Sequence, residues 1–225
     1  MDTIEKVKKD YDLISHHFSD TRQHPWPEMM EAIELIPVGS KILDLGCGNG
    51  RLIKAIPKDK QVSYKGVDLS DGMIQEAKIN HPTEDFQVEN VLDISYKKEF
   101  DIILSFAVLH HLPTEKDRII AFKRINEALK DNGLFIFTVW NMWSIKRIML
   151  IFNSIFSNNY RFRDCLVPWN HTSGEKILRY YYAFTKKEVT TLLQKTGFSV
   201  ITAINSPRNK NIFSCSNFFF VAKKK

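Results

Sequence analysis

The chain has 225 residues, of which 44% are hydrophobic and 26% are charged, and this balance is typical of one globular domain with a sizeable core. No uninterrupted apolar run reaches the length of a membrane span, and the charged first 20 residues do not resemble a secretory signal. The three cysteines lack Cys-x-x-Cys spacing, which argues against a disulfide framework and against a zinc site. These features favour a cytoplasmic protein without membrane contact.

The formal net charge of +6 and the isoelectric point of about 9.1 permit nucleic-acid binding. A lysine-rich composition without any role in binding explains the same charge equally well. Part of the excess lies in the terminal Lys223-Lys224-Lys225, for which we expect a solvated tail.

Residues 3–36 predict two helices separated by His24-Pro25-Trp26-Pro27, because these prolines cannot lie inside one continuous helix. An α/β core follows, with helices expected at 50–56, 71–80 and 114–130, the last stopped by Asp131-Asn132-Gly133. Seven apolar segments predict strands, at residues 41–45, 62–67, 85–88, 101–106, 134–140, 198–204 and 217–222. Since helices connect the earlier strands, their pairings should be parallel, as in a doubly wound sheet.

The segment 141–184 interrupts this alternation of strands and helices. Apolar residues recur there at helical spacing and predict a short helix with one apolar face: Ile145, Ile148, Met149, Phe152, Ile155 and Phe156. Such a face could pack in the core, form a lid over a site, or meet a partner or a membrane. Its position after the fifth strand favours a lid. We therefore expect a single domain, with residues 1–36 as a helical extension, residues 37–225 as the main body and 141–184 as an inserted lid.

The most informative segment is residues 41–51, which read KILDLGCGNGR. A strand runs into a turn with Gly46, Gly48 and Gly50, where the backbone must turn tightly and let a ligand approach. Asp68 follows the next strand, so its carboxylate can accept hydrogen bonds from the two hydroxyls of a ribose. The spacing differs from the G-x-G-x-x-G of dinucleotide sites, and Asp44 before the turn would repel phosphate but suits a cationic amino-acid ligand.

These features together resemble the class I S-adenosylmethionine (SAM)-dependent methyltransferases. The resemblance implies a Rossmann-like seven-stranded α/β sheet with helices on both faces, SAM as methyl donor and no metal. It also implies cofactor-binding residues along the ends of the first four strands: Asp44, Gly46, Gly48, Asp68, Leu69, Asn90, Val91 and Phe106. Asn90 stands where this superfamily usually has an acidic residue for the adenine amino group, and it can still accept through its amide oxygen.

The fourth strand is followed by His110-His111, which could provide a general base or a metal ligand. The alternative is one packed and one exposed histidine. A metal site is disfavoured, because no cysteine or carboxylate lies nearby at ligand spacing.

Stretches outside the glycine turn are similar to the tRNA wobble-uridine carboxymethyl O-methyltransferases. They are Tyr11-Asp12, HFSDTR at 17–22, PWP at 25–27, AVLHHL at 107–112, LVPW at 166–169 and RYYYAF at 179–184. The resemblance spans roughly residues 10 to 222. The chain departs from the family pattern at Tyr182, where histidine is usual, and in residues 141–165, which are fewer and more apolar than expected.

The resemblance implies methyl transfer from SAM to the carboxylate of 5-carboxymethyluridine at the tRNA wobble position. Arg22, Arg179 and His111 are then candidate catalytic residues, because an arginine among apolar and aromatic residues needs a carboxylate or phosphate partner. The candidate substrate-binding residues are aromatic: Phe18, Trp26, Trp169 and Tyr181. A packed aromatic cluster is the alternative explanation for them.

The implied partners are the tRNA anticodon region and a small zinc-binding activator subunit, which often accompanies eukaryotic and archaeal members of the family. Two other functions stay open. The same core serves small-molecule O- and N-methyltransferases, and a non-catalytic subunit of this fold could only bind RNA or a partner. The intact glycine turn and Asp68 argue against a non-catalytic subunit.

Overall fold

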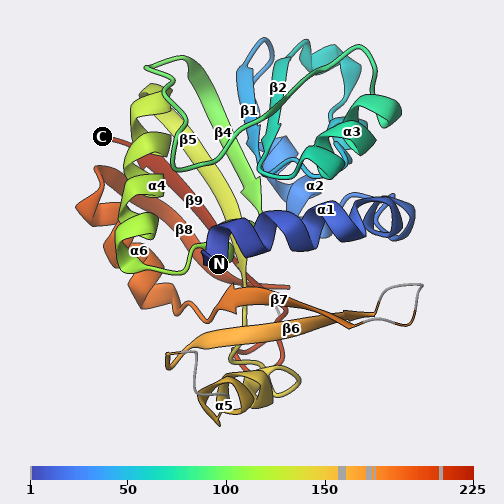
Figure 1. Ribbon diagram of the computed structural model, residues 1–225. Coiled ribbons are helices and arrows are strands. Elements are labelled where there is room, and N and C mark those ends of the chain that lie inside the picture. Colours follow the sequence, from blue (N-terminus) through green and yellow to red (C-terminus); the bar gives the residue numbers. More distant parts are fainter. Residues whose placement is uncertain (1, 157–160, 171–173, 175, 208–209) are drawn as a thin grey trace.

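The computed structural model describes residues 2–156, 161–170, 174, 176–207 and 210–225 (Figure 1). Its centre is a seven-stranded sheet in the order β3-β2-β1-β4-β5-β9-β8. The strands are β1 (Lys41–Leu45), β2 (Ser63–Asp68), β3 (Asp85–Val88), β4 (Phe100–Phe106), β5 (Leu129–Trp140), β8 (Phe198–Ser206) and β9 (Asn217–Lys224). All seven predicted strands are confirmed.

The first five strands pair in parallel, as expected, whereas β9 is antiparallel to both β5 and β8. In the parallel part, β1, β2 and β4 therefore end at one edge of the sheet, at Leu45, Asp68 and Phe106. Residues that follow these strands are brought together there, although they are far apart in the sequence.

Helices cover both faces of the sheet, which confirms the predicted α/β class. Alternate residues of β1 enter different core clusters, because successive side chains of a strand point to opposite faces. One cluster includes side chains of α4 (Glu115–Ala128) and α6 (Lys186–Lys195), and the other includes side chains of α2 (Pro27–Glu34) and α3 (Asp71–Asn80). The N-termini of α3, α4 and α6 are capped by hydroxyl side chains, those of Ser70, Thr114 and Thr185.

The predicted break in residues 3–36 is confirmed. Helix α1 (Thr3–Thr21) ends before the prolines, and Pro27 opens α2 at its first position. Figure 1 shows α1 running between the carboxyl edge of the sheet and the strand β7 (Lys176–Tyr182). Asp12 fixes α1 to the start of α3, because one of its carboxylate oxygens accepts from Ser70 Oγ at 2.6 Å and from the Gly72 N–H at 3.1 Å.

Three local expectations were wrong. Residues 50–56 form turns and a 3₁₀ helix (Ile53–Ala55), since Gly50 has φ +77° and Pro57 follows too closely for an α-helix. Helix α4 ends at Ala128 and passes directly into β5, which contains residues 131–133. Lys224 is not in a solvated tail, because it belongs to β9 and its Nζ donates to the carbonyls of Asn126 and Leu129 at 2.6 and 2.7 Å.

The segment 141–184 contains the predicted short helix, α5 (Ile148–Phe156), and an unpredicted two-stranded antiparallel sheet of β6 (Asp164–Asn170) and β7. The predicted apolar face of the helix is only partly correct. Ile148 and Ile151 pack toward β6 and β7, while Ile145, Met149 and Phe152 are exposed. The side chains of residues 155 and 156 lie outside the described part. No described helix is long and apolar enough to cross a membrane.

Candidate active site

The glycine turn after β1 is held by the backbone of β2. The N–H groups of Gly46 and Cys47 donate to the Val67 carbonyl at 2.7 and 3.0 Å. Gly46 has φ +76°, and a Cβ at this position would lie 2.2 Å from Val108 Cγ2, so only glycine fits. A Cβ on Gly48 would instead meet nothing closer than Phe18 Cε1 at 3.9 Å, which leaves open space beside the backbone for a ligand.

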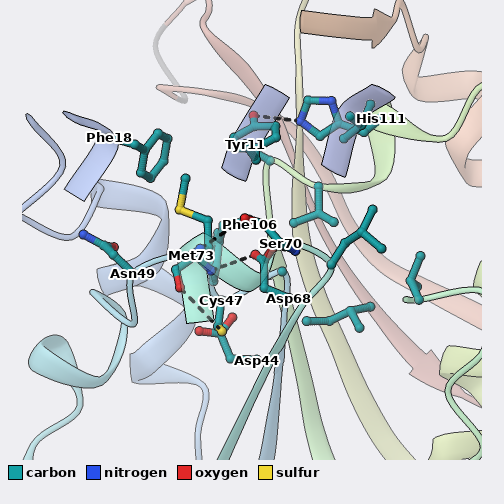
Figure 2. A pocket seen from close by; sticks show the side chains of 18 of the residues that line it. Tyr11, Phe18, Asp44, Cys47, Asn49, Asp68, Ser70, Met73, Phe106 and His111 are labelled. Atoms are coloured by element: carbon teal, nitrogen blue, oxygen red, sulfur yellow. Dashed lines mark hydrogen bonds between the residues drawn. The ribbon is translucent and has the colours of Figure 1, made fainter. Parts of the chain in front are cut away.

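Asp68, at the end of β2, joins the glycine turn to α3. Its Oδ2 accepts from the Gly48 N–H and its Oδ1 from the Ser70 N–H, each at 2.9 Å. Burial raises the pKa of this carboxyl, and these two backbone donors oppose the rise. Each oxygen keeps a second lone pair, so the carboxylate can still accept from a diol. Figure 2 shows Asp68 and Ser70 beside Asp44 and Cys47, with Tyr11 and Phe18 of α1 opposite them.

Asp44 is more deeply buried and accepts a hydrogen bond from the Tyr64 hydroxyl at 2.7 Å. Burial, reinforced by the charge of Asp68, raises the pKa of Asp44 to about 7. A cation beside Asp44 would therefore favour its ionised form.

Every residue that the sequence suggested for cofactor binding lines a single pocket at this sheet edge: Asp44, Gly46, Gly48, Asp68, Leu69, Asn90, Val91 and Phe106. Asn90 Oδ1 also accepts from the Leu92 N–H at 3.0 Å, so this side chain stabilises the turn in which it lies as well as lining the pocket. The geometry thus joins a diol acceptor, an open glycine backbone and a buried acid in one cavity.

The candidate acceptor residues line the same pocket: Phe18, Arg22, Trp26, His111, Trp169, Arg179 and Tyr181. They come from α1, the α1–α2 loop, the 3₁₀ helix Leu109–His111 after β4 and the β6–β7 sheet. Arg22 and Arg179 lie 5.2 and 4.8 Å from the Trp169 ring centre. Within the described ranges neither arginine forms a salt bridge, and the nearby carboxylate of Asp10, which is hydrogen-bonded to Lys6, acts on Arg179 only at longer range.

His111 is held in one orientation by two hydrogen bonds. Its Nδ1 lies 2.7 Å from the Tyr180 carbonyl, which can only accept, so Nδ1 carries the proton and Nε2 accepts from the Tyr11 hydroxyl at 3.0 Å (Figure 2). The Tyr11 oxygen in turn accepts from Arg179 Nη1 at 3.2 Å. Burial lowers the pKa of His111 to about 3, so the ring is neutral at pH 7. His110 is fully buried and stacks on Tyr181 with ring centres 4.6 Å apart, whereas His111 is half-buried, so neither histidine of the pair is exposed.

Several residues that line this pocket were not predicted from the sequence, among them the polar Tyr11 and Arg51. In the sequence Tyr11 stands out only as part of a family motif. Its hydrogen bond with Arg179 joins residues that are 168 positions apart, which the sequence does not reveal. Arg51 follows the last glycine of the turn directly, which was the available signal. Among the described residues, no cluster of three or more histidine, cysteine or acidic side chains could hold a metal.

Helix α5 contributes none of its described residues to the pocket, whereas the β6–β7 sheet contributes Trp169, Arg179 and Tyr181. The part of 141–184 that reaches the site is therefore the sheet, which the sequence did not predict.

Comparisons with known proteins agree with this geometry. The family description "Methyltransferase domain" matches residues 18–203. A tRNA (carboxymethyluridine(34)-5-O)-methyltransferase of Schizosaccharomyces pombe is 30% identical over 217 residues, covering 88% of this chain and 90% of that protein. The Saccharomyces cerevisiae protein of the same name is 34% identical over 137 residues, covering 60% of this chain and 48% of its own length. The chain thus spans about half of this second relative.

Solved structures show the same fold. A SAM-dependent methyltransferase of Methanosarcina mazei superposes with a TM-score of 0.71 at 21% identity, covering 89% of this chain and 98% of that one. A complex of the Haloferax volcanii Trm112 methyltransferase activator and a putative methyltransferase matches with a TM-score of 0.70 at 15% identity and 97% coverage of both chains. The chain belongs to the class I SAM-dependent methyltransferases.

Proposed function

We propose that the protein transfers a methyl group from SAM to the carboxylate of 5-carboxymethyluridine at the tRNA wobble position, which forms a methyl ester. The observation that carries this proposal is the acceptor end of the pocket, where Arg22 and Arg179 lie near Trp169 and form no salt bridge with any described residue, although the Asp10 carboxylate acts on Arg179 at longer range. An anionic group attached to a planar base fits such a site. The names of the yeast relatives support the same acceptor.

The donor set of the pocket fits SAM. Asp68 would accept from the ribose hydroxyls, the open space at Gly48 would admit the ligand, and the acid Asp44 would favour the cationic amino group. Bound SAM supplies an electrophilic methyl group on a sulfonium. Asn90 and Val91 would border the adenine, since they follow β3 at the same edge.

The acceptor carboxylate is already ionised at neutral pH, because its reference pKa lies near 4. No general base is then required. His111 is suited to positioning the Tyr11 hydroxyl, because its own orientation is fixed by the hydrogen bond from Nδ1 to the Tyr180 carbonyl. Arg179 would hold one carboxylate oxygen and leave the other free to attack. Trp169 and Phe18, whose ring centres lie 5.7 Å apart with 29° between their planes, would exclude water and border the base.

The remaining proposals concern partners and organisation. Basic side chains outside the pocket would hold the anticodon region with salt-sensitive affinity. A zinc-binding activator subunit is proposed by analogy with the Trm112 complex of Haloferax volcanii. Residues 1–36 and 141–184 would then act as a helical extension and a lid of one domain that works in the cytoplasm.

A comparison of acceptors tests this function against its main rival, a small-molecule O- or N-methyltransferase. Labelled SAM is incubated with tRNA bearing 5-carboxymethyluridine, with an unmodified transcript of the same tRNA and with a panel of small carboxylic acids and amines. The proposal predicts label only in the modified tRNA. Label in the small acids or amines, with none in either tRNA, would establish the rival.

A further inference from the structure

The outer side of α5 is apolar and exposed. Met149 and Phe152, which are three residues apart and so share one side of the helix, are 61% and 47% exposed. Ile145, in the turn before the helix, is 72% exposed. The other side of α5 carries Ile148 and Ile151, which pack toward β6 and β7. A helix that is apolar on both sides is normally buried on both, so we expect a further surface to cover the outer side of α5.

The loop between β8 and β9 extends this exposed surface. The Ile145 N–H donates to the Phe213 carbonyl at 2.9 Å, and the Phe213 side chain is exposed. Figure 1 shows α5 at one end of the molecule, on the far side of β6 from β7. None of the described residues of α5 lines the active-site pocket, so methyl transfer does not explain these exposed side chains. We call Ile145, Met149, Phe152 and Phe213 the outer apolar face.

The charge of the chain is concentrated around this face. Residues 141–163 and 205–216 hold six of the 32 lysine and arginine residues and none of the 26 aspartate and glutamate residues. The other 26 cations of the chain are balanced by those 26 anions, so the whole formal net charge of +6 comes from these two segments. Like charges gathered beside an apolar face point to an anionic partner.

Part of this charge is available for binding. Three of the cations are exposed and form no salt bridge with a described residue: Lys146, Arg161 and Lys210. Two others are engaged within the protein, since Arg147 donates to backbone carbonyls and Arg163 pairs with Glu188 at 2.8 Å. The acid next to these segments, Asp164, accepts from the Tyr180 hydroxyl at 2.6 Å.

A lipid bilayer with anionic head groups offers both an apolar layer and negative charge. Exposed aliphatic and aromatic side chains beside cations are typical of helices that lie in the membrane interface. A tRNA backbone would satisfy the cations but not Ile145 or Met149, because its phosphates and sugars are polar. A second copy of the chain would bring two sets of like charges together.

We infer that α5 and the neighbouring loop dock the protein peripherally on an anionic lipid bilayer. The outer apolar face enters the boundary between head groups and acyl chains, and Lys146, Arg161 and Lys210 contact the head groups. Such docking needs no spanning helix, and the described part of the chain contains none. The inference replaces the sequence-based expectation of no membrane contact, which considered only a span and a secretory signal. It is independent of the methyl acceptor.

Flotation with vesicles tests the role of the cations. The protein is mixed with vesicles of phosphatidylcholine and with vesicles in which phosphatidylglycerol replaces part of this lipid. Wild type should prefer the anionic vesicles by roughly 100-fold, because each of the three cations contributes about fivefold, and added salt should reduce this preference. The triple variant Lys146→Gln, Arg161→Gln, Lys210→Gln should lose most of the preference. A control of equal net charge should keep it, with exposed lysines replaced on other elements: Lys58→Gln, Lys78→Gln and Lys123→Gln.

Two further variants test insertion of the apolar face. Met149→Gln combined with Phe152→Gln should weaken binding to anionic vesicles by about tenfold or more. The matched control replaces two equally exposed apolar residues of α1 and α3, Leu13→Gln and Ile79→Gln, and should bind as wild type does. Phe152→Trp should add fluorescence that is quenched by vesicles with brominated acyl chains.

The inference is wrong if wild type does not float with anionic vesicles, if both triple variants lose equal affinity, or if the fluorescence added by Phe152→Trp is not quenched. Binding of S-adenosylhomocysteine by each variant verifies that it is folded. Anisotropy with labelled tRNA separates lipid from RNA. Loss of tRNA affinity in the Lys146, Arg161 and Lys210 variant, together with no vesicle binding by wild type, would assign the surface to RNA and overturn the inference.

Discussion

Replacing Asp68 by Asn should weaken cofactor binding more than any other conservative change at the ribose end. In the protein each carboxylate oxygen accepts one backbone N–H at 2.9 Å, from Gly48 and from Ser70, and keeps a lone pair for one ribose hydroxyl. The amide retains one acceptor but places an NH₂ group against the other donor. One hydrogen bond to the ribose is therefore lost, at about 1.5–3 kcal/mol for a bond to a charged group, which is about 10- to 150-fold in affinity.

Calorimetric titration with S-adenosylhomocysteine measures this loss, with Asp71→Asn as the matched control. Asp71 lies three residues further on, is largely exposed, and among the described residues pairs with Lys8 at the surface, so its variant should bind within about twofold of wild type. The melting temperature of ligand-free Asp68→Asn should also fall, since the Gly48 or Ser70 N–H loses its acceptor. Equal affinities for wild type and Asp68→Asn would refute the assignment of the ribose to this carboxylate.

Three further changes test other parts of the site and fold. Because the pKa of Asp44 is raised from 3.8 to about 7 in the folded protein, its contribution to the free energy of unfolding declines as the pH rises through this interval. The melting temperature of Asp44→Asn minus that of the wild type should therefore be higher at pH 8 than at pH 5. An equal difference at the two pH values would contradict the raised pKa of Asp44. Arg179→Lys should lower single-turnover methylation at saturating tRNA by roughly tenfold while S-adenosylhomocysteine affinity stays within about twofold; normal turnover would reduce Arg179 to a structural role. Lys224→Met should destabilise the protein by about 1–3 kcal/mol because two buried carbonyls lose their donor, whereas Lys225→Met should have no measurable effect in urea unfolding.

The strands of the main sheet could be predicted because their apolar runs are short, continuous and bounded by turn residues. The limits of α3 are also visible in the sequence, since Ser70 caps its start and His81-Pro82 follows its end. The pocket residues could be placed at one sheet edge because parallel strands end together. Pattern alone was sufficient for the strands and for α3, whereas pocket residues such as Asn90 and Phe106 were predicted from the resemblance to the class I methyltransferases.

The β6–β7 sheet and the buried side of α5 could not be predicted in this way. Residues 164–170 and 176–182 mix proline, charged and aromatic side chains, so neither segment shows a clean alternation. Which side of α5 is buried depends on the position of β6 against it, and that is a tertiary contact. The same holds for the chain of hydrogen bonds from Arg179 through Tyr11 to His111, whose members come from three distant segments.

The central claim is the chemical nature of the product, and nucleoside mass spectrometry tests it most directly. tRNA bearing 5-carboxymethyluridine is incubated with the protein and SAM, digested to nucleosides, and analysed before and after mild alkali. We predict a wobble nucleoside heavier by one methyl group that returns to the starting nucleoside after alkali, because an ester is hydrolysed there. A methylated nucleoside that resists alkali, or an unchanged wobble nucleoside under conditions where the protein binds SAM, would contradict the account.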